Sequence, residues 1–266
     1  MNPVENVHLD ADLERRFGGL RRLHGDPGYA RLRAARVAVV GLGGVGSWCA
    51  EALARSGVAS LVLVDLDQVA ESNINRQVQA LGTTVGQAKV WALQQRIADI
   101  HPGCRVLPVE DFATADNWPA LLPTEVDAVV DACDQSSAKL HLAAWSLACG
   151  VPLVCVGAAG GKLQPQRVEV DDLAQVTHDP LLAGLRQRLR QRHGAARTGS
   201  MGVRCVFSRE PVAPPADACA VGDGSLNCAG YGSSVTVTAT FGMVAAAEAI
   251  AKILSRPLPQ TEISCL

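Results

Sequence analysis

Two short apolar runs mark the first part of the chain, RVAVV at 36–40 and LVLVD at 61–65. Neither run alternates with polar residues, which is typical of parallel strands buried on both faces of a sheet. The stretch from Gly44 to Ser56 between them has helical composition and is followed by Gly57, a residue suited to the end of a helix. The pattern predicts a strand–helix–strand unit.

The alternation of strand and helix continues along the chain. It predicts helices over Gly86 to Ile100 and Ser136 to Cys149, and strands over Arg105 to Val109, Asp127 to Val130, Val151 to Val156 and, antiparallel, around Arg167 to Val170. This order predicts an α/β fold: a Rossmann-like, doubly wound, mostly parallel sheet with helices on both faces and a C-terminal antiparallel elaboration. Ligands of such sheets bind at the carboxyl ends of the strands.

The last long apolar run, Ser234 to Leu254, has a length compatible with a membrane span. Its first part, Val235 to Thr240, alternates with threonine, and Glu248 and Lys252 interrupt the remainder. We therefore expect a strand followed by a buried helix within 233–255, in preference to membrane association through 234–254.

The chain of 266 residues is 48% hydrophobic, enough for a substantial core, and is near the upper size for one domain. We expect a single domain over 1–266. It divides into an N-terminal helical arm at 8–35, a nucleotide-binding core at 36–157, an elaboration with a basic helix and loop at 158–232, and the C-terminal segment at 233–255.

The first 35 residues are polar and carry several arginines, so they do not resemble a signal peptide. Five of the nine cysteines fall in or beside predicted buried elements, which fits reduced thiols in a cytoplasmic protein. No two cysteines have the C-x-x-C spacing that is typical of structural zinc sites.

The net charge of −2 conceals a basic segment, because no Asp or Glu occurs from Pro180 through Arg209. A solvated helix face is one interpretation of this segment. The other is a phosphate-contacting surface for RNA. Its RNA-binding candidates are Arg186, Arg188, Arg190 and Arg192.

A G-x-G-x-x-G motif, GLGGVG at 41–46, follows the first predicted strand and precedes a helix. Gly41 permits a tight turn, Gly43 lets the backbone approach phosphates beside Gly44, and Gly46 lets the helix pack closely. Asp65, at the end of the next strand, can accept hydrogen bonds from ribose hydroxyls. On this motif alone, an NAD-dependent oxidoreductase is the leading hypothesis.

The following stretch, DLDQVAESNINRQ at 65–77, shifts the balance toward ATP. ATP brings roughly four negative charges, more than a dinucleotide pyrophosphate, and these must be countered by cations and metal. Arg76 and Lys89 can supply the cations. The polar residues that can position phosphate oxygens or each other are Asn73, Asn75 and Gln77.

The order of these elements resembles the superfamily of ubiquitin-activating-enzyme-like adenylating proteins. The shared signature is GLGGVGS at 41–47, the D-x-D pair Asp65 and Asp67, the N-x-N-R-Q run ending at Gln77, Lys89, and Asp134 within VVDACD. The resemblance covers roughly residues 12–255.

That resemblance implies a role for each matched residue. Asp134 would bind Mg²⁺, Arg76 and Lys89 would stabilise the polyphosphate and the transition state, and Asp65 would hold the ribose. For Asp131, beside the nucleotide site, a structural hydrogen bond at the strand end is the alternative to a direct role.

Arg15 and Arg16 precede the first strand in the motif ERRFGGL. In the superfamily, an arginine from the N-terminal helix reaches the ATP of the partner in a homodimer. One of the two is therefore a candidate arginine finger, and a plain surface cation is the alternative.

Further motifs resemble the tRNA threonylcarbamoyladenosine dehydratase family within this superfamily. They are ERRFGG at 14–19, GGVGSW at 43–48, GAAGG at 157–161, DPL at 179–181, GVRCVFS at 202–208 and NCAGYG at 227–232. The resemblance implies that ATP adenylates the threonyl carboxylate of modified tRNA, and that an internal nucleophile of the ureido group displaces AMP. It implies tRNA and no DNA as partner, and it leaves room for a sulfur-relay protein.

Two further functions remain open from the residues. An activator of a ubiquitin-like sulfur-carrier protein is the alternative, although the two C-x-x-C pairs common in those proteins are missing. An NAD-dependent oxidoreductase or nucleotide-sensing module would leave Arg76 and Lys89 without a clear task. Cys228 is the candidate for a functional thiol, with a small buried residue as the competing interpretation.

Overall fold

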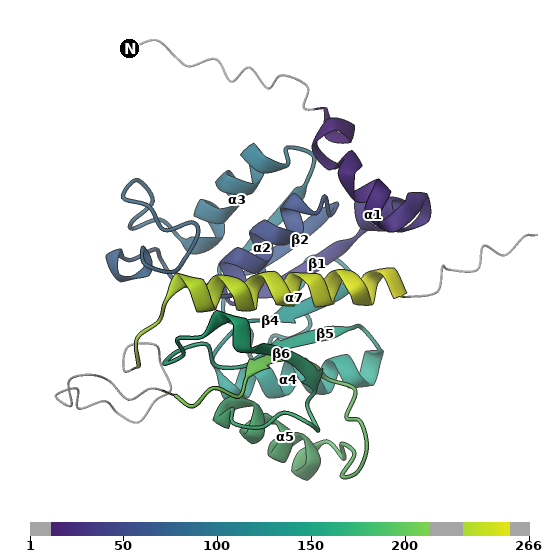
Figure 1. Cartoon of the computed structure of the whole chain (residues 1–266), viewed down its shortest axis with the longest axis vertical. Helices are drawn as coiled ribbons and strands as arrows, with labels where there is room; N and C mark the ends of the chain where they lie inside the picture. The colour runs from purple at the N-terminus through teal and green to yellow at the C-terminus, as the bar shows by residue number, and fades with distance from the viewer. Residues whose placement is uncertain (1–11, 213–230, 256–266) are drawn as a thin grey trace, which may run out of the picture.

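The computed structural model describes residues 12–212 and 231–255 and contains one seven-stranded sheet (Figure 1). The strands lie in the order β3-β2-β1-β4-β5-β7-β6. Their bounds are Arg36–Val40 for β1, Ser60–Val64 for β2, Arg105–Val109 for β3, Ala128–Asp131 for β4, Leu153–Val156 for β5, Val168–Asp172 for β6 and Arg204–Ser208 for β7. The order reverses between β1 and β4, which is where doubly wound sheets bind ligands.

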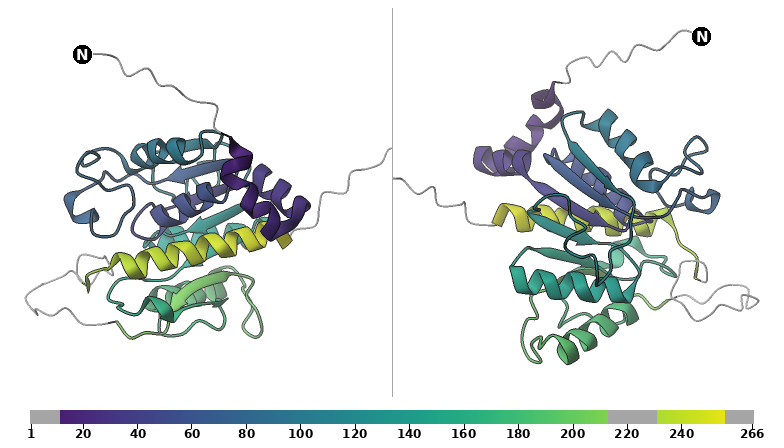
Figure 2. Two further views of the ribbon diagram at one scale, coloured as in Figure 1. Left: turned by 45° about the horizontal axis from the view of Figure 1, so that its top comes forward. Right: turned by 180° about the vertical axis from the view of Figure 1, so that it is seen from behind.

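Helices cover both faces of the sheet, as the alternation of elements predicts (Figure 2). The α-helices of the described residues are α1 (Leu13–Ala34), α2 (Gly46–Arg55), α3 (Lys89–Ile100), α4 (Ser136–Cys149), α5 (Pro180–Arg192) and α7 (Val235–Ser255). Alternate strand residues separate into two cores. Val37 and Val39 face α2, α3 and α7, whereas Ala38 and Val40 face α4 and α5.

The pairing confirms the expected mostly parallel sheet. β1 to β5 run parallel to their neighbours and β7 runs parallel to β5, whereas β6 pairs with β7 in the antiparallel direction. Strand β7 was not expected, because GVRCVFS at 202–208 follows a basic, glycine-containing stretch. It extends the parallel sheet beside β5, with Cys205 opposite Cys155, and it carries the antiparallel edge strand.

The chain from Val235 to Ser255 is a single helix, so the expected strand over Val235 to Thr240 is wrong. The Val–Thr alternation has the period of a strand, but Val237, Phe241 and Ala245 recur at helical spacing and are buried against α2 and the sheet. Gly242 permits this contact, because an added Cβ would lie 2.5 Å from the Val45 carbonyl oxygen. Tertiary packing overrides the local pattern.

Among the helices that the structure describes, α7 is the one that is long and apolar enough to span a membrane. In the structure one side of it packs into the core formed by α2, β4 and β5. Helices at the core of globular proteins meet the same criteria of length and composition.

Candidate functional site

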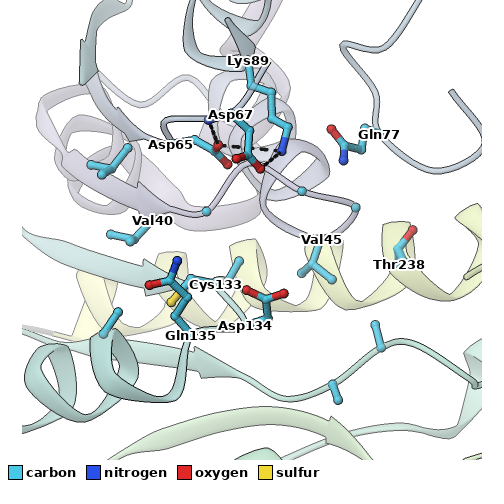
Figure 3. Close-up of a pocket in the computed structure, with 18 of the residues that line it drawn as sticks. Val40, Val45, Asp65, Asp67, Gln77, Lys89, Cys133, Asp134, Gln135 and Thr238 are labelled. Carbon is cyan, nitrogen blue, oxygen red and sulfur yellow. Dashed lines mark hydrogen bonds and ion pairs between the residues drawn. The ribbon is translucent and has the colours of Figure 1, made fainter. Parts of the chain in front are cut away.

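A cavity of about 300 Å³ opens at the carboxyl ends of the parallel strands (Figure 3). One wall consists of the glycine turn after β1 and the segments that follow β2. The opposite wall consists of the segments that follow β4 and β5, together with the beginning of α7. The sequence places the ligand site at this edge of the sheet, and the structure puts a cavity there.

The glycine turn leaves space on the cavity side and none on the helix side. Gly41 has a φ of +85°, and an added Cβ would lie 2.8 Å from the Cys133 nitrogen. At Gly46 an added Cβ would lie 1.8 Å from the Gly41 carbonyl oxygen. At Gly43 no heavy atom lies within 4 Å of an added Cβ, and Gly43 lines the cavity. The turn therefore has the open backbone position that a phosphate needs.

Asp65, Asp67 and Lys89 form a charged group on one wall of the cavity (Figure 3). Asp65 is 7% exposed, and its carboxylate accepts hydrogen bonds from the amides of Leu42 (2.6 Å) and Asp67 (2.8 Å). The Lys89 ammonium lies 2.6 Å from Asp67 Oδ2 and 3.7 Å from Asp65 Oδ1. Burial raises the pKa of the Asp65 carboxyl, against the opposing effect of Lys89.

The N-x-N-R-Q run brings Asn73, Arg76 and Gln77 to the same wall. The Arg76 guanidinium donates hydrogen bonds to the Ser72 carbonyl oxygen at 2.6 Å and to Asn75 Oδ1 at 2.9 Å. Asn75 does not line the cavity itself; its Nδ2 donates to the Ser233 carbonyl oxygen. Its contact with Arg76 makes it a neighbour of the cation.

Asp134 lies on the opposite wall, in the segment between β4 and α4 (Figure 3). Its side chain is exposed and faces the cavity across from Lys89. A carboxylate on one wall and a buried ammonium on the other suit a polyphosphate with a hard cation between them.

Asp131, predicted among the nucleotide-binding residues, does not line the cavity, and its position favours the alternative of a structural hydrogen bond at the strand end. It is 0% exposed, and its Oδ2 lies 3.1 Å from the ammonium of Lys139, which is also 0% exposed. Burial opposes the charge on Lys139, but Asp131 holds its pKa above the usual range. The sequence reasoning missed Lys139, because a lysine three residues into a helix is normally exposed.

The structure adds cavity residues that were not among the predicted site residues. The segment after β3 contributes Phe112, the segment after β5 contributes 158–160, and the start of α7 contributes Thr238. The GAAGG motif directly after a strand was the available signal for the second of these. Thr238 had none, because its segment was expected to be a strand.

Other candidate residues lie away from the cavity. Arg16 donates to the carbonyl oxygens of Asp99 and Ile100 at the end of α3, and Arg15 is an exposed residue in the first turn of α1. Neither lines the cavity of a single chain, so a role across a dimer stays a prediction. Cys228 lies outside the described residues.

The basic helix α5 is only partly available to a ligand. Arg186 donates to the carbonyl oxygens of Leu173 and Val176, and Arg188 donates to that of Ser136. Arg190 donates to carbonyl oxygens in the segment after the helix, whereas Arg192 is exposed. Three of the four arginines predicted to bind RNA thus fasten α5 to neighbouring segments.

Comparisons with known proteins agree with this geometry. The profile of the ThiF family matches residues 15–264. The tRNA threonylcarbamoyladenosine dehydratase of Escherichia coli K12 is 42% identical over 266 residues, which span 96% of this chain and 99% of that protein. A crystal structure of the E. coli enzyme in complex with ATP superposes with a TM-score of 0.82 at 41% identity, covering 91% of this chain and 96% of that one. A complex of the same enzyme with AMP gives the same values.

Proposed function

Because the chain belongs to the ThiF family, we propose that it catalyses the ATP-dependent dehydration of threonylcarbamoyladenosine in tRNA to a cyclic nucleoside. The similarity to a dehydratase along nearly the whole of both chains carries this proposal. The cavity agrees with it, because a glycine turn, a buried lysine and a facing carboxylate surround a space at the switch point of the sheet.

The reaction needs activation because a carboxylate is a poor electrophile. An oxygen of the threonyl carboxylate attacks the α-phosphorus of ATP, and the bond to pyrophosphate breaks. A nucleophilic atom of the ureido group then attacks the activated carbonyl carbon, loses its proton, and AMP leaves with the carboxylate oxygen. The substrate loses one water overall, and no covalent nucleophile from the protein is required.

The cavity residues divide this work by position. The open Gly43 position and the start of α2 receive phosphate oxygens, and Asp65 accepts ribose hydroxyls. Lys89 and Arg76 offset the negative charge that develops as pyrophosphate leaves. Lys89 must turn from Asp67 toward the phosphates, a small movement because its ammonium already lies at the cavity wall.

Mg²⁺ fits the donor set at the site. In the described part of the chain, no three His, Cys, Asp or Glu side chains are arranged to hold a metal by themselves. Mg²⁺ in nucleotide sites is held by one or two carboxylates plus phosphate oxygens, and Asp134 supplies such a carboxylate. When bound, the ion would neutralise phosphate charge.

Mass spectrometry of tRNA nucleosides tests the proposal directly. Incubation of threonylcarbamoyladenosine-containing tRNA with ATP, Mg²⁺ and the protein should lower the mass of that nucleoside by about 18 daltons, the mass of water. Lys89→Ala and Asp134→Ala should each abolish the change, because each removes one of the facing charges. Asp134→Ala should keep the unfolding temperature within a few degrees because its side chain is exposed, whereas Lys89→Ala should lower it by several degrees because buried Asp65 loses its facing ammonium.

Two results would contradict the proposal. Near-normal turnover in both variants would show that Lys89 and Asp134 do not form the catalytic site. An unchanged nucleoside mass with the wild-type protein would show that it does not catalyse the proposed dehydration. Release of pyrophosphate with a Gly-Gly-ended carrier protein, but not with tRNA, would favour the sulfur-carrier alternative.

The proposal extends to partners and location. We assign the protein to the cytoplasm, where tRNA is modified, and we expect a homodimer in which Arg15 or Arg16 reaches the partner's nucleotide. The family resemblance also leaves room for a sulfur-relay protein as a partner. Analytical ultracentrifugation tests the dimer.

A further inference from the structure

Lys139 is a lysine of α4 whose entire side chain is enclosed by the protein. Lysines are rarely buried, because an ammonium loses its hydration unless charges and acceptors replace it. Here the replacements are complete: Asp131 Oδ2 lies 3.1 Å away, the Val156 carbonyl oxygen accepts at 2.7 Å and the Asp131 carbonyl oxygen at 3.3 Å.

The acceptors of Lys139 come from the last residues of two neighbouring strands. Asp131 ends β4 and Val156 ends β5. Directly after those residues the chain forms the cavity wall, as 132–135 on one side and 157–160 on the other. One ammonium therefore connects the two segments that form the wall opposite the glycine turn.

Asp131 also forms hydrogen bonds to Cys133, the residue directly before Asp134. Its Oδ1 accepts from the Cys133 amide at 3.3 Å and from the Cys133 thiol at 2.9 Å. Its Oδ2 also accepts from the thiol of Cys155 in β5 at 3.3 Å. Cys133 itself lines the cavity and immediately precedes Asp134.

We propose that Lys139 is a positioning residue for the adenylation reaction: with Asp131 it holds the segments 132–135 and 157–160 at a fixed separation, so that Asp134 keeps its place across from Lys89. The inference rests on the proposed function, but its structural part concerns only these two segments.

Stability alone gives a poor account of this pair. A buried ion pair often contributes no more to stability than apolar residues of similar volume, because both ions must be desolvated. An ammonium has three protons in diverging directions, and here they can serve acceptors on two different strands. An apolar side chain would fill the space without joining the strand ends.

The decisive experiment replaces both charges together. Lys139→Met with Asp131→Asn leaves no unpaired charge and keeps an acceptor for the Cys133 amide, so the unfolding temperature should stay within a few degrees of wild type. The kcat of nucleoside cyclisation should fall by roughly tenfold to a hundredfold with little change in KM for ATP, since small displacements of reacting groups cost that much.

A direct structural measurement accompanies the kinetics. Hydrogen–deuterium exchange at 132–135 and 157–160 should increase in both segments together, with or without ATP. Lys139→Gln with Asp131→Asn should recover part of the kcat and of the protection, because an amide can donate to a strand-end carbonyl oxygen where a thioether cannot.

Arg204→Met is the matched control. It breaks another ion pair, Arg204 with Glu248 at 2.8 Å, which joins the amino-terminal end of β7 to α7. This variant should lower the unfolding temperature and leave both kcat and the exchange of the two segments unchanged.

Wild-type kcat in the Lys139→Met, Asp131→Asn variant, or increased exchange in only one of the two segments, would overturn the proposal. The proposal would also be overturned if Arg204→Met lowered kcat and increased the exchange of both segments as much as the double variant does. Loss of positioning with intact ATP binding would leave the proposed function standing.

Discussion

The glycines of the turn at 41–46 face different neighbours, so their substitution should have different effects. Gly46→Ala should destabilise the protein by roughly 2 kcal/mol or more, because its Cβ would meet the Gly41 carbonyl oxygen. Gly43→Ala should leave stability unchanged but weaken ATP binding by about tenfold, because its Cβ points into free space where a phosphate would lie.

Calorimetry measures both quantities, one by thermal unfolding and the other by titration with a non-hydrolysable ATP analogue. Gly82→Ala is the control, because its Cβ also meets no neighbour and Gly82 does not line the cavity. Equal ATP affinity of the Gly43 and Gly82 variants would argue against a phosphate at the turn.

The sequence could identify the residues on the walls better than those behind them. Gly41, Lys89 and Asp134 belong to motifs whose spacing in the sequence indicates their chemistry. The sequence pattern does not show that Asp131 is buried and Asp134 exposed, because both residues follow the same apolar run. Only the three-dimensional path of the chain turns Asp131 inward. Lys139 is recognisable only once its acceptors on two strands are known.

At the scale of elements, helix α1 is attached to the end of α3 through buried His101. Arg33 Nη1 lies 2.8 Å from His101 Nε2, and Phe17 of α1 packs against the imidazole at 4.6 Å between ring centres. Burial, together with Arg33 and Arg16, lowers the pKa of His101 to about 4. The ring is therefore neutral in the folded protein at neutral pH.

This arrangement predicts a pH-dependent stability. Because the unfolded chain takes up a proton at His101 near pH 6.5 and the folded one only near pH 4, stability is complete above 6.5 and falls as the pH drops between these values. The loss should be roughly 1–3 kcal/mol. Denaturant titrations at several pH values measure it. His101→Gln should flatten the slope in that window, and an unchanged slope would contradict the assignment.

The helices and strands were predicted unevenly, for physical reasons. Helix α4 and strand β3 match their expected bounds, because strong periodicity, turn residues and Gly150 mark their ends. For α7 the helix was predicted in the second part of the segment, but a strand was predicted over Val235 to Thr240. The Val–Thr alternation there is typical of a strand, and only packing against α2 favours the helix. Strand β7 was missed because its sequence follows a basic, glycine-containing stretch, although it is as long as β1.

At the scale of the whole molecule, the arrangement of charge changes the prediction for RNA. Arg192 and Arg197 are exposed, whereas Arg186 is engaged with carbonyl oxygens. Arg192→Glu with Arg197→Glu should weaken tRNA binding and make the logarithm of the affinity less dependent on salt by about two units of slope. Filter binding at several salt concentrations measures both.

Arg186→Ala serves as the contrasting variant. It should lower the unfolding temperature and leave the salt dependence unchanged, because it removes two internal hydrogen bonds. If the double charge reversal leaves affinity and slope unchanged, the exposed end of α5 is a solvated face and the tRNA binds elsewhere.

Helix α7 has a consequence for how the protein becomes active in the cell. The ribosome makes this helix after every other element that the structure describes, yet Phe241 and Ala245 complete the core beneath the glycine turn and Thr238 completes the cavity. A nascent chain that has emerged only as far as β7 has its motifs for ATP but lacks the helix that covers β4 and β5. Nucleotide capture is therefore expected to wait for α7, so that interrupted synthesis yields chains that neither bind ATP nor consume it.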